Sequence, residues 1–358
     1  MSIRIITAFI LALLFATAFG RFYIPWLRRQ KVGQEIKEDG PVWHMSKSGT
    51  PTMGGAIFIL ACLFGVLTVG FHGMLQGNFL HLYVFVFALV FGCIGFLDDW
   101  EKLKKKQNLG LTSRNKFLLQ LAASLLFEVL MARFSYISTD LYVPFFQWYL
   151  HIPKWLYFVL SAFIIVGTVN AVNITDGIDG LATGTSLPVF LFFVAVTYLA
   201  GGRLSELGVF ASALLGGLVG FLFYNFNPAK VFMGDTGSLF LGGALAGLAF
   251  AYDMPLILIT LGFVYLVETL SDIIQIGYFK LTHGKRVFKM APFHHHLEMG
   301  GWTGKKWSEK ELFFLFTGVS LLFAIISFLG VYPRYLQSFR KTIRREVASR
   351  RFFLYNPI

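Results

Sequence analysis

Five polar motifs interrupt an otherwise apolar sequence, and each carries residue types that can bind anions or hard cations. The first motif is the adjacent pair Asp98 and Asp99, which precedes a lysine-rich run. Adjacent carboxylates at a helix end point in different directions, so one can face a metal ion while the other faces a lysine or a substrate. Mg²⁺ takes oxygen ligands and binds through one or two carboxylates plus substrate phosphates. A solvated helix end beside the lysines is the alternative for this motif taken alone.

The segment 170–180 brings two Asn, two Asp and two Gly into apolar sequence. Gly permits positive φ, and Asn and Asp favour turns, so the segment predicts a turn between two helices. A turn alone does not require four amide and carboxylate groups where polar groups are costly. We therefore favour ligand binding by this segment.

Residues 225–238 end in M-G-D-T-G-S and precede an apolar run, which predicts the start of a helix. A helix N-terminus offers free N–H groups and a positive dipole end, and both suit phosphate. Asp235 is either an N-cap acceptor or a member of a site shared with the other acids.

Three consecutive histidines, His294, His295 and His296, lie between two apolar runs. Consecutive helical residues point about 100° apart, so the three imidazoles cannot all bind one metal ion. One or two of them can neutralise phosphate oxygens, and a polar helix start is the alternative.

Glu268 and Asp272 are four residues apart, and therefore share a helix face. These two acids either face a water-filled cavity or pack against each other as a polar pair. Acids inside a membrane segment are also expected in a transporter.

The composition excludes an ordinary soluble protein. The chain has 358 residues, of which 56% are hydrophobic and 14% charged, with a mean hydropathy of +0.66. Soluble domains carry about 25% charged residues. The net charge of +12 would suggest nucleic acid in a soluble protein, but in a membrane protein it reflects orientation, so we expect no nucleic-acid partner. Cys62 and Cys93 lie inside apolar runs, which argues against a disulfide or a metal site.

Ten segments are long and apolar enough to predict membrane helices of roughly 20 residues. Open sheets do not survive in lipid, so the expected fold is all-α, a polytopic helical bundle. The predicted segments are 3–20, 53–71, 80–97, 117–132, 155–172, 181–200, 207–224, 236–253, 256–279 and 312–331.

Charge indicates the orientation of these segments. The loops after the odd-numbered segments carry most of the 31 Lys and Arg residues, beginning with the basic loop 21–47. Basic loops stay in the cytoplasm, which predicts an outside N-terminus. The polar groups that then fall on the cytoplasmic face are Lys47 and Thr52, Asp98 and Asp99, Asp176 and Asp179, Asp235, and the three histidines. An even number of segments then puts the basic tail 334–358 outside, against the same rule. We predict a single transmembrane domain over 1–333, followed by this tail.

Taken together, the motifs closely resemble those of phospho-N-acetylmuramoyl-pentapeptide transferases. The motifs, in the family's order, are T-P-T-M-G-G at 50–55, D-D at 98–99, N-A-V-N-I-T-D-G-I-D-G-L-A at 170–182, F-M-G-D-T-G-S at 232–238 and A-P-F-H-H-H-L-E at 291–298. The triple histidine distinguishes this branch from the related polyprenyl-phosphate N-acetylglucosamine-1-phosphate transferases, which remain the alternative.

The resemblance implies transfer of phospho-MurNAc-pentapeptide from UDP-MurNAc-pentapeptide to undecaprenyl phosphate, giving lipid I and UMP with Mg²⁺ as cofactor. It also implies ten transmembrane helices with both termini periplasmic. The protein would lie in the bacterial inner membrane as a homodimer, with its active site on the cytoplasmic face.

The resemblance also assigns roles to residues. Asp235 would coordinate Mg²⁺, and Asp98, Asp99 and His294 would join it as catalytic residues, with Asp98 the candidate base. Lys47, Asp179, Asn225 and Phe232 would hold the uridine, with Phe232 stacked on uracil. The remaining substrate-binding residues would be Thr52, Asn173, Asp176 and Gly234 in the nucleotide pocket, and Lys102, Lys116, His295 and His296, with His294, at the pyrophosphate and sugar.

For the reaction, we hypothesise direct attack by the prenyl phosphate, although a route through an aspartyl-phosphate is chemically open. We also predict that the ninth segment, which contains Gly262 and Gly277, bends to open a lipid-facing groove. Two other classes fit less well. An ion-coupled transporter should hold its acids near the bilayer midplane, and a scaffold has no need of clustered carboxylates.

Overall fold

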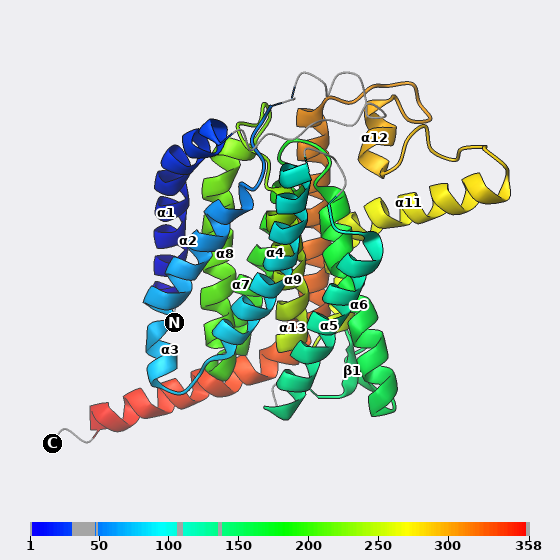
Figure 1. The fold of residues 1–358 in the computed structure, drawn as a ribbon. Helices are drawn as coiled ribbons and strands as arrows, with labels where there is room; N and C mark the ends of the chain where they lie inside the picture. The colour runs from blue at the N-terminus through cyan, green and yellow to red at the C-terminus, as the bar shows by residue number, and fades with distance from the viewer. Residues whose placement is uncertain (1, 31–46, 48, 106–109, 135–137, 356–358) are drawn as a thin grey trace.

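The computed structural model describes residues 2–30, 47, 49–105, 110–134 and 138–355, with side chains described from Ile3 as far as Leu336. The described part is an all-α bundle with one small hairpin, as Figure 1 shows. Its helices are α1 (Ser2–Arg29), α2 (Gly55–Val69), α3 (Phe71–Leu75), α4 (Leu80–Lys105), α5 (Ser113–Arg133), α6 (Lys154–Thr175), α7 (Leu181–Ala200), α8 (Ser205–Asn225), α9 (Gly234–Ala251), α10 (Leu258–Leu261), α11 (Phe263–Leu281), α12 (Phe293–Glu298) and α13 (Glu309–Tyr355), with 3₁₀ turns η2 (Gly202–Leu204) and η3 (Pro255–Ile257).

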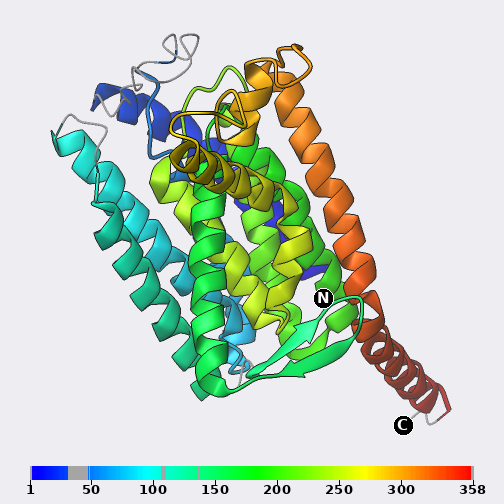
Figure 2. The same cartoon turned by 90° about the vertical axis from the view of Figure 1, so that its right-hand side faces the viewer.

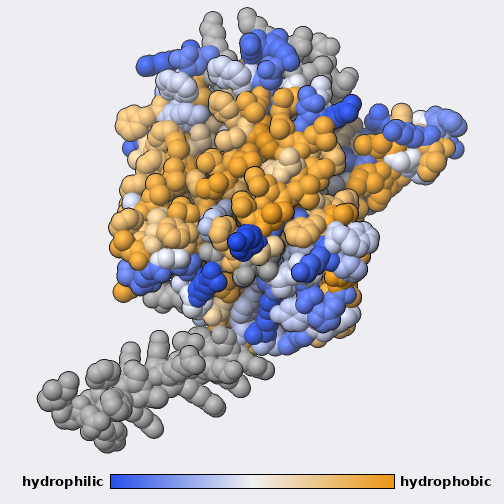
Figure 3. Space-filling view, turned by 60° about the horizontal axis from the view of Figure 1, so that its bottom comes forward, coloured by the Kyte–Doolittle hydropathy of each residue, from blue (hydrophilic) through white to orange (hydrophobic). Residues whose placement is uncertain are grey.

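Within the described residues, seven helices are long and apolar enough to cross a membrane, and the bent pair α10 and α11 makes an eighth candidate. The other two predicted segments form α2, an apolar helix of 15 residues, and α9, which has 18. Figure 3 shows a broad apolar surface between polar ends. The chain is therefore a multi-pass membrane protein with an all-α fold, as predicted.

Helix α9 lies at the centre of the bundle, where every residue from Thr236 to Ala251 is buried. Small residues allow this packing. A Cβ added to Gly95 of α4 would collide with the backbone carbonyl of Asp235, so α4 and the start of α9 are in direct contact. At Gly242 of α9, an added Cβ would lie 2.5 Å from the Cα of Val169 in α6. Helices α4 and α6 are thus held against α9.

A hairpin lies at the opposite end of the bundle from the start of α9 (Figures 1 and 2). Strands β1 (Asp140–Val143) and β2 (Trp148–His151) pair antiparallel, with Asp140 opposite His151. The guanidinium of Arg334 in α13 lies 4.1 Å from the ring centroid of Tyr142 and donates to the backbone carbonyl of Asp253 at 2.8 Å. The hairpin, the end of α13 and the loop after α9 therefore form one packed unit.

The predicted bend in the ninth segment is confirmed, whereas the lipid-facing groove that it was expected to open stays a prediction. Helices α10 and α11 meet at Gly262 with an angle of 81° between them. In Figure 1, α11 leaves the bundle and projects sideways. Gly277 lies within α11, and nothing lies within 4 Å of a Cβ added there, so it takes no part in the bend.

Two predicted features fall partly beyond the described residues. Residues 31–46 of the basic loop are among those outside the description, as are the side chains of the tail from 337 onwards. The predicted domain boundary after residue 333 lies within α13, which continues as helix through Pro333 to Tyr355. The division into a domain and a tail stays a prediction.

Candidate active site

Three carboxylates meet where α4 ends and α9 begins. Asp98 and Asp99 lie in the last two turns of α4 and are buried, while Asp235 lies in the first turn of α9 and is half-buried. An oxygen of each lies within 4.8 Å of an oxygen of the other two. We call Asp98, Asp99 and Asp235 the carboxylate triad. The sequence predicted that these residues share a site, and the structure brings them together.

Asp99 holds the start of α9. Its Oδ1 accepts the backbone N–H of Asp235 at 3.1 Å, and its Oδ2 accepts the N–H of Thr236 at 2.9 Å and the Thr236 hydroxyl at 2.7 Å. A carboxylate at a helix N-terminus satisfies free N–H groups and complements the helix dipole. The cap of α9 is therefore supplied by Asp99 from another helix, and the side chain of Asp235 is available for other partners.

Gly234 allows this arrangement because its backbone has φ +70°, a conformation that favours glycine. A Cβ at Gly234 would lie 2.7 Å from Asp99 Oδ2 and 2.7 Å from the hydroxyl of Thr52. Thr52 is buried in a segment that pairs with the start of α9, where Phe232 N–H donates to the Pro51 carbonyl at 2.8 Å. Gly234 and Thr52 thus line the triad on one side.

Two lysines balance the negative charge. Lys102 Nζ lies 2.6 Å from Asp98 Oδ2 and 2.9 Å from Asp235 Oδ2, and Lys116 Nζ lies 2.9 Å from the same Asp235 oxygen. Asn173 donates to Asp235 Oδ1 at 2.8 Å. The sequence predicted substrate contacts for Lys102, Lys116 and Asn173. The side chains of all three contact carboxylates of the triad.

The triad fits a magnesium ion. Its donor atoms are carboxylate oxygens, which are the ligands that a hard divalent cation prefers. Among the described residues, no other group of His, Cys, Asp or Glu side chains comes close enough to share an ion. The three histidines are not among these grouped side chains.

A second group of side chains surrounds Asp179, the buried acid in the loop between α6 and α7. Its Oδ1 accepts Lys47 Nζ at 2.7 Å, and its Oδ2 accepts the Asn227 amide at 3.0 Å. Glu309, in the first turn of α13, lies 2.5 Å from Lys47 and also accepts the N–H of Asp179 at 3.0 Å. We call Lys47, Asp179, Asn227 and Glu309 the lysine–acid cluster.

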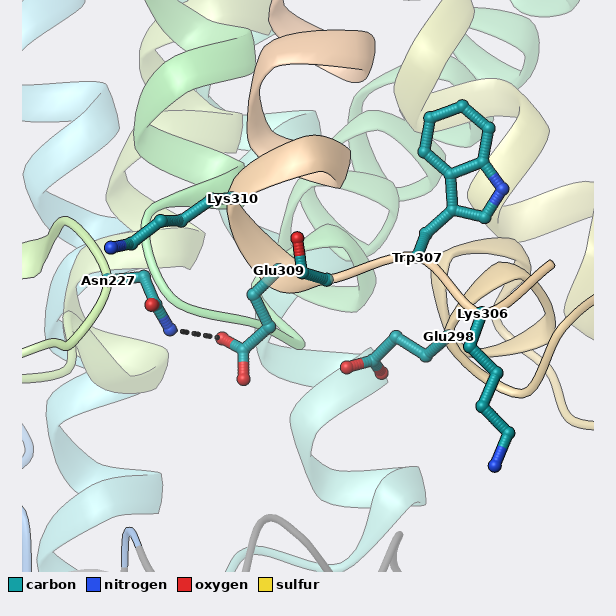
Figure 4. A pocket seen from close by; sticks show the side chains of 7 residues that line it. Asn227, Glu298, Lys306, Trp307, Glu309 and Lys310 are labelled. Atoms are coloured by element: carbon teal, nitrogen blue, oxygen red, sulfur yellow. Dashed lines mark hydrogen bonds between the residues drawn. The ribbon is translucent and has the colours of Figure 1, made fainter.

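A pocket of about 270 Å³ opens beside this cluster (Figure 4). In Figure 4 the Asn227 amide points to the Glu309 carboxylate, with a hydrogen bond of 3.2 Å between them. The residues that line the pocket are Asn227, Glu298, Lys306, Trp307, Ser308, Glu309 and Lys310. The pocket therefore lies between the lysine–acid cluster and the end of α12, and carries charges of both signs.

The short helix α12 directs its three histidines to different partners. His294 and His296 are fully buried, whereas His295 is partly exposed. His294 Nδ1 lies 2.9 Å from Glu268 Oε2, and His295 Nδ1 lies 2.6 Å from Glu298 Oε2.

His296 is held differently. Its Nδ1 accepts the backbone N–H of Lys289 at 3.1 Å, and its ring packs against Phe288 and Trp302. Burial lowers the pKa of His296, and the charge of Lys289 acts in the same direction. In this structure, burial and the charge of Lys289 therefore both disfavour the protonated form of His296.

The loop that follows α6 connects the two groups of side chains. Asn173, in the last turn of α6, contacts the triad, and Asp179, six positions further along the chain, belongs to the lysine–acid cluster. Asp176 lies between the two and is half-buried. Burial raises the pKa of Asp176 well above its ordinary value, and the negative charges of Asp235, Asp99 and Asp179 add to the effect.

Two residues predicted to bind uridine lie close by in the segment before α9. Asn225 is buried, accepts the Thr183 hydroxyl at 2.7 Å and donates to the Val231 carbonyl at 3.1 Å. These bonds hold the turn between α8 and α9. Phe232 is half-buried, and its carbonyl accepts the N–H of Gly54 at 2.8 Å.

Two members of the lysine–acid cluster, Asn227 and Glu309, were not predicted from the sequence. Asn227 lies inside a motif that the sequence singled out, but nothing in its spacing distinguishes it from Asn225. Glu309 begins the last helix, where an acid at a helix N-terminus is ordinary. Its position on the same predicted face as the motifs was the one available signal.

Comparisons with known proteins give relatives along nearly the whole chain. A family model described as glycosyl transferase family 4 matches residues 81–253. A phospho-N-acetylmuramoyl-pentapeptide-transferase of Carboxydothermus hydrogenoformans is 46% identical over 334 residues, covering 91% of this chain and 98% of the relative. Proteins of the same name from Clostridium botulinum and Geobacillus thermodenitrificans are each 44% identical, covering 91% and 92% of this chain and 96% and 97% of those proteins.

Proposed function

The chain belongs to the phospho-N-acetylmuramoyl-pentapeptide transferase family, and from that premise we propose the reaction it performs. It transfers phospho-MurNAc-pentapeptide from UDP-MurNAc-pentapeptide to undecaprenyl phosphate, releasing UMP and forming lipid I. The observation that carries this proposal is the carboxylate triad with two lysines beside it, since three acids and two ammonium groups within contact distance suit a reaction between two phosphate anions.

We propose that the cofactor is Mg²⁺, held by Asp235 with the neighbouring carboxylates of Asp98 and Asp99. The ion would neutralise charge on the diphosphate and on the departing UMP. The oxygen-only donor set and the short separations within the triad support this assignment.

The protein's own residues position and neutralise the reacting groups. Lys102 and Lys116 already lie within 2.9 Å of an acidic oxygen, so they are in place to contact phosphate oxygens that enter the site. Asp98 would act as base toward the acceptor phosphate. Because the second pKa of a phosphate monoester is about 6, much of the acceptor is already dianionic at neutral pH and the proton transfer adds little.

Direct attack by the acceptor phosphate remains our proposal for the chemical step. Both oxygens of Asp99 accept hydrogen bonds from the start of α9, which makes that carboxylate a poor nucleophile. A trapped aspartyl-phosphate on Asp98, after incubation with the nucleotide substrate alone, would overturn direct attack.

We propose that the uridine binds at the lysine–acid cluster and the segment before α9. The 2.7 Å contact between Lys47 and Asp179 supports placing both in one subsite. Phe232 would stack on uracil, and Asn225 would shape this subsite by fixing the turn beside it. The residues proposed to complete the nucleotide and sugar pocket are Thr52, Asn173, Asp176, Gly234, His294, His295 and His296.

For membrane topology, we propose ten transmembrane helices in the bacterial inner membrane, with both termini periplasmic and the site facing the cytoplasm. The first residues of α1 support this, because Arg4 contacts Glu206 at the start of α8, and α8 ends beside the site. We also propose a homodimer, on the family's precedent, which light scattering of the purified protein in detergent would test.

The decisive test is an assay of UMP release from purified protein with undecaprenyl phosphate. We expect release from UDP-MurNAc-pentapeptide that requires Mg²⁺ and is abolished by a chelator. Preference for UDP-N-acetylglucosamine would instead place the chain with the related N-acetylglucosamine-1-phosphate transferases. An Asp235→Asn variant serves as the matched negative control, and full activity of that variant would reject the proposed site.

A further inference from the structure

A carboxylate and an imidazole form an isolated pair in the interior beside the site. Glu268 lies on α11 and His294 on α12, and neither side chain is exposed to solvent. One oxygen of the Glu268 carboxylate, Oε2, is hydrogen-bonded to His294. The other oxygen has no hydrogen-bond partner among the described residues. Burying a charge in this way is costly unless it has a function or a partner.

One oxygen of Glu268 holds both the backbone and the ring of His294. Oε2 lies 2.9 Å from Nδ1 and accepts the backbone N–H at 3.3 Å. With Nδ1–H donating to the carboxylate, the tautomer and the ring orientation are both fixed. Where an imidazole acts through Nε2, proteins commonly fix its orientation with a carboxylate that accepts a hydrogen bond from Nδ1.

The other ring nitrogen, Nε2, is buried and makes no hydrogen bond to any described residue. It abuts Gly177, since a Cβ added to that glycine would collide with Nε2. Gly177 follows Asp176, in the loop that connects the triad to the lysine–acid cluster. A buried ring nitrogen without a partner, aimed at this loop, points to a ligand as its intended partner.

The other two histidines of α12 are placed differently. In His296, Nδ1 accepts a backbone N–H, so the ring proton is on Nε2, the opposite tautomer to that of His294. His295 is hydrogen-bonded to a carboxylate of its own helix. The ring of His294 is bonded to an acid from another helix, whereas the buried Nε2 of His296, which also has no hydrogen-bond partner among the described residues, has no such carboxylate on its Nδ1. The difference singles out the Glu268–His294 pair.

We propose that Glu268 is a positioning residue for the transfer reaction: it fixes His294 so that Nε2 donates a hydrogen bond to a phosphate oxygen of the nucleotide donor. This rests on the function proposed above. For Nε2 to donate while Nδ1–H is bonded to Glu268, Nε2 takes up a proton from solvent; the new N–H then donates to the phosphate oxygen, and the carboxylate of Glu268 balances the charge of the ring. Other charged or titratable groups near the ring are Asp272 on α11, His295 on α12 and Asp176 in the facing loop.

A double-mutant cycle tests this inference on the full-length protein, with UMP release as the readout. We expect Glu268→Ala to lower kcat about 10- to 100-fold, with little change in KM for the nucleotide donor. The same substitution in a His294→Ala background should have almost no further effect, because Glu268 acts through the ring that is missing. Independent, multiplying effects of the two substitutions would overturn the proposal.

Conservative variants separate positioning from a purely structural role. In Glu268→Gln the amide oxygen still accepts from His294, so the fold is kept while the charge is lost, and we expect kcat to fall about 10-fold with an unchanged melting temperature. A wild-type kcat in Glu268→Gln would show that the charge has no role. Glu101→Gln on the surface of α4 makes the same change of charge away from this ring, is the matched control and should keep full activity. If the wild-type protein releases no UMP, the proposed function fails instead, and the cycle is not reached.

Discussion

At the scale of single residues, the three aspartates of the triad have different partners although they are chemically identical. Asp99 binds the N–H groups at the start of α9, Asp235 binds two lysines, and Asp98 accepts the N–H of Leu111 at 2.9 Å as well as Lys102. A carboxylate that caps a helix contributes to stability, and one that contacts only side chains contributes mainly to charge balance. Substitutions at the three positions should therefore have different consequences.

We predict that Asp99→Asn destabilises the protein as well as inactivating it. An Asn side chain has one acceptor oxygen, so at least one of the three donors on Asp235 and Thr236 loses its partner, at a cost of about 1–3 kcal/mol. Asp98→Asn should lose activity with a smaller loss of stability. Thermal unfolding of both variants in the same detergent measures the difference, and equal losses would contradict the capping role.

The lysine–acid cluster gives a prediction about substrate affinity. In Glu309→Gln, Lys47 loses one of its two carboxylate partners, although the Gln oxygen can still accept from the N–H of Asp179. We expect KM for the nucleotide donor to rise about 3- to 10-fold, with kcat nearly unchanged, because Lys47 is then held by one charge-assisted hydrogen bond to a carboxylate instead of two. Glu101→Gln, which breaks an ion pair with Lys105 on the surface of α4, is the control with the same change of charge. A fall in kcat alone would argue against a binding role.

His296 makes stability depend on pH. Its pKa is lowered by burial and by Lys289, so the folded protein binds a proton at this ring less readily than the unfolded chain, whose pKa is about 6.5. Stability from this group is present above that value and is lost as the pH falls through it. The Gln side chain in His296→Gln can still accept the N–H of Lys289. As the pH is lowered from about 7.5 to 5.5, we expect the melting temperature of this variant to fall less than that of the wild type. Parallel melting curves for the two proteins would show that the ring is not the cause.

The sequence predicted the chemical residues better than their partners. Asp98, Asp99 and Asp235 could be found because carboxylates near apolar segments are rare and costly. Glu309 and Asn227 could not, since nothing local distinguishes them from an ordinary helix start and an ordinary turn residue. Their importance comes from a contact with Asp179, which is far away in the sequence.

At the scale of helices, the site depends on the distance between α4 and α9. The triad draws two acids from one helix and one from the other, so any increase in their separation moves the carboxylates apart. The sequence predicted both helices from their hydropathy. It did not predict their contact, because the glycines that permit it resemble the other glycines of membrane helices.

We predict that Gly95→Ala disrupts the site without altering any polar group. The added methyl group would collide with the backbone carbonyl of Asp235, and overpacking of this kind costs about 1–3 kcal/mol. We expect a lower melting temperature together with a weakened response to Mg²⁺, measured as the cation concentration for half-maximal UMP release. Gly167→Ala on α6 meets no atom within 4 Å and serves as the control. Unaltered Mg²⁺ dependence in Gly95→Ala would show that the helices can adjust.

The bend in the ninth segment was predicted from the sequence, and the β1–β2 hairpin was not. A bend in the ninth segment was predicted because the site must admit a prenyl chain from the membrane and this segment combines glycines with an acidic face, and the structure places the bend at Gly262. The hairpin of β1 and β2 was not predicted, since its four-residue strands are too short for a reliable alternating pattern. Its position depends on Arg334, which lies far away in the sequence and packs on Tyr142.

At the scale of the whole molecule, the site and the hairpin lie at opposite ends of α9. The 18 residues of that helix are about 27 Å long, close to the thickness of the hydrocarbon core of a bilayer, which is about 30 Å. Figure 3 shows apolar surface between the two polar ends. The two ends should therefore face opposite compartments.

Cysteine labelling in membrane vesicles can test this arrangement. His151 in the hairpin has 78% of its side chain exposed, and Lys305 near α12 has 57% exposed. In a background where Cys93 is replaced by Ser, we expect a membrane-impermeant thiol reagent to label His151→Cys from the outside and Lys305→Cys in inverted vesicles only. Labelling of both from one side would contradict the proposed topology.

Beyond the bend at Gly262, α11 runs outside the bundle with few protein neighbours along its flanks (Figure 1). Ile273, Ile274 and Ile276 are 59%, 48% and 55% exposed, so the surroundings that stabilise these side chains are acyl chains and not the rest of the fold. Glu268 sits on this same arm, bonded to His294. Under the proposed role of His294, the lipid around this arm would affect the placement of the imidazole, and we expect turnover to fall in a short-chain detergent that replaces the acyl chains.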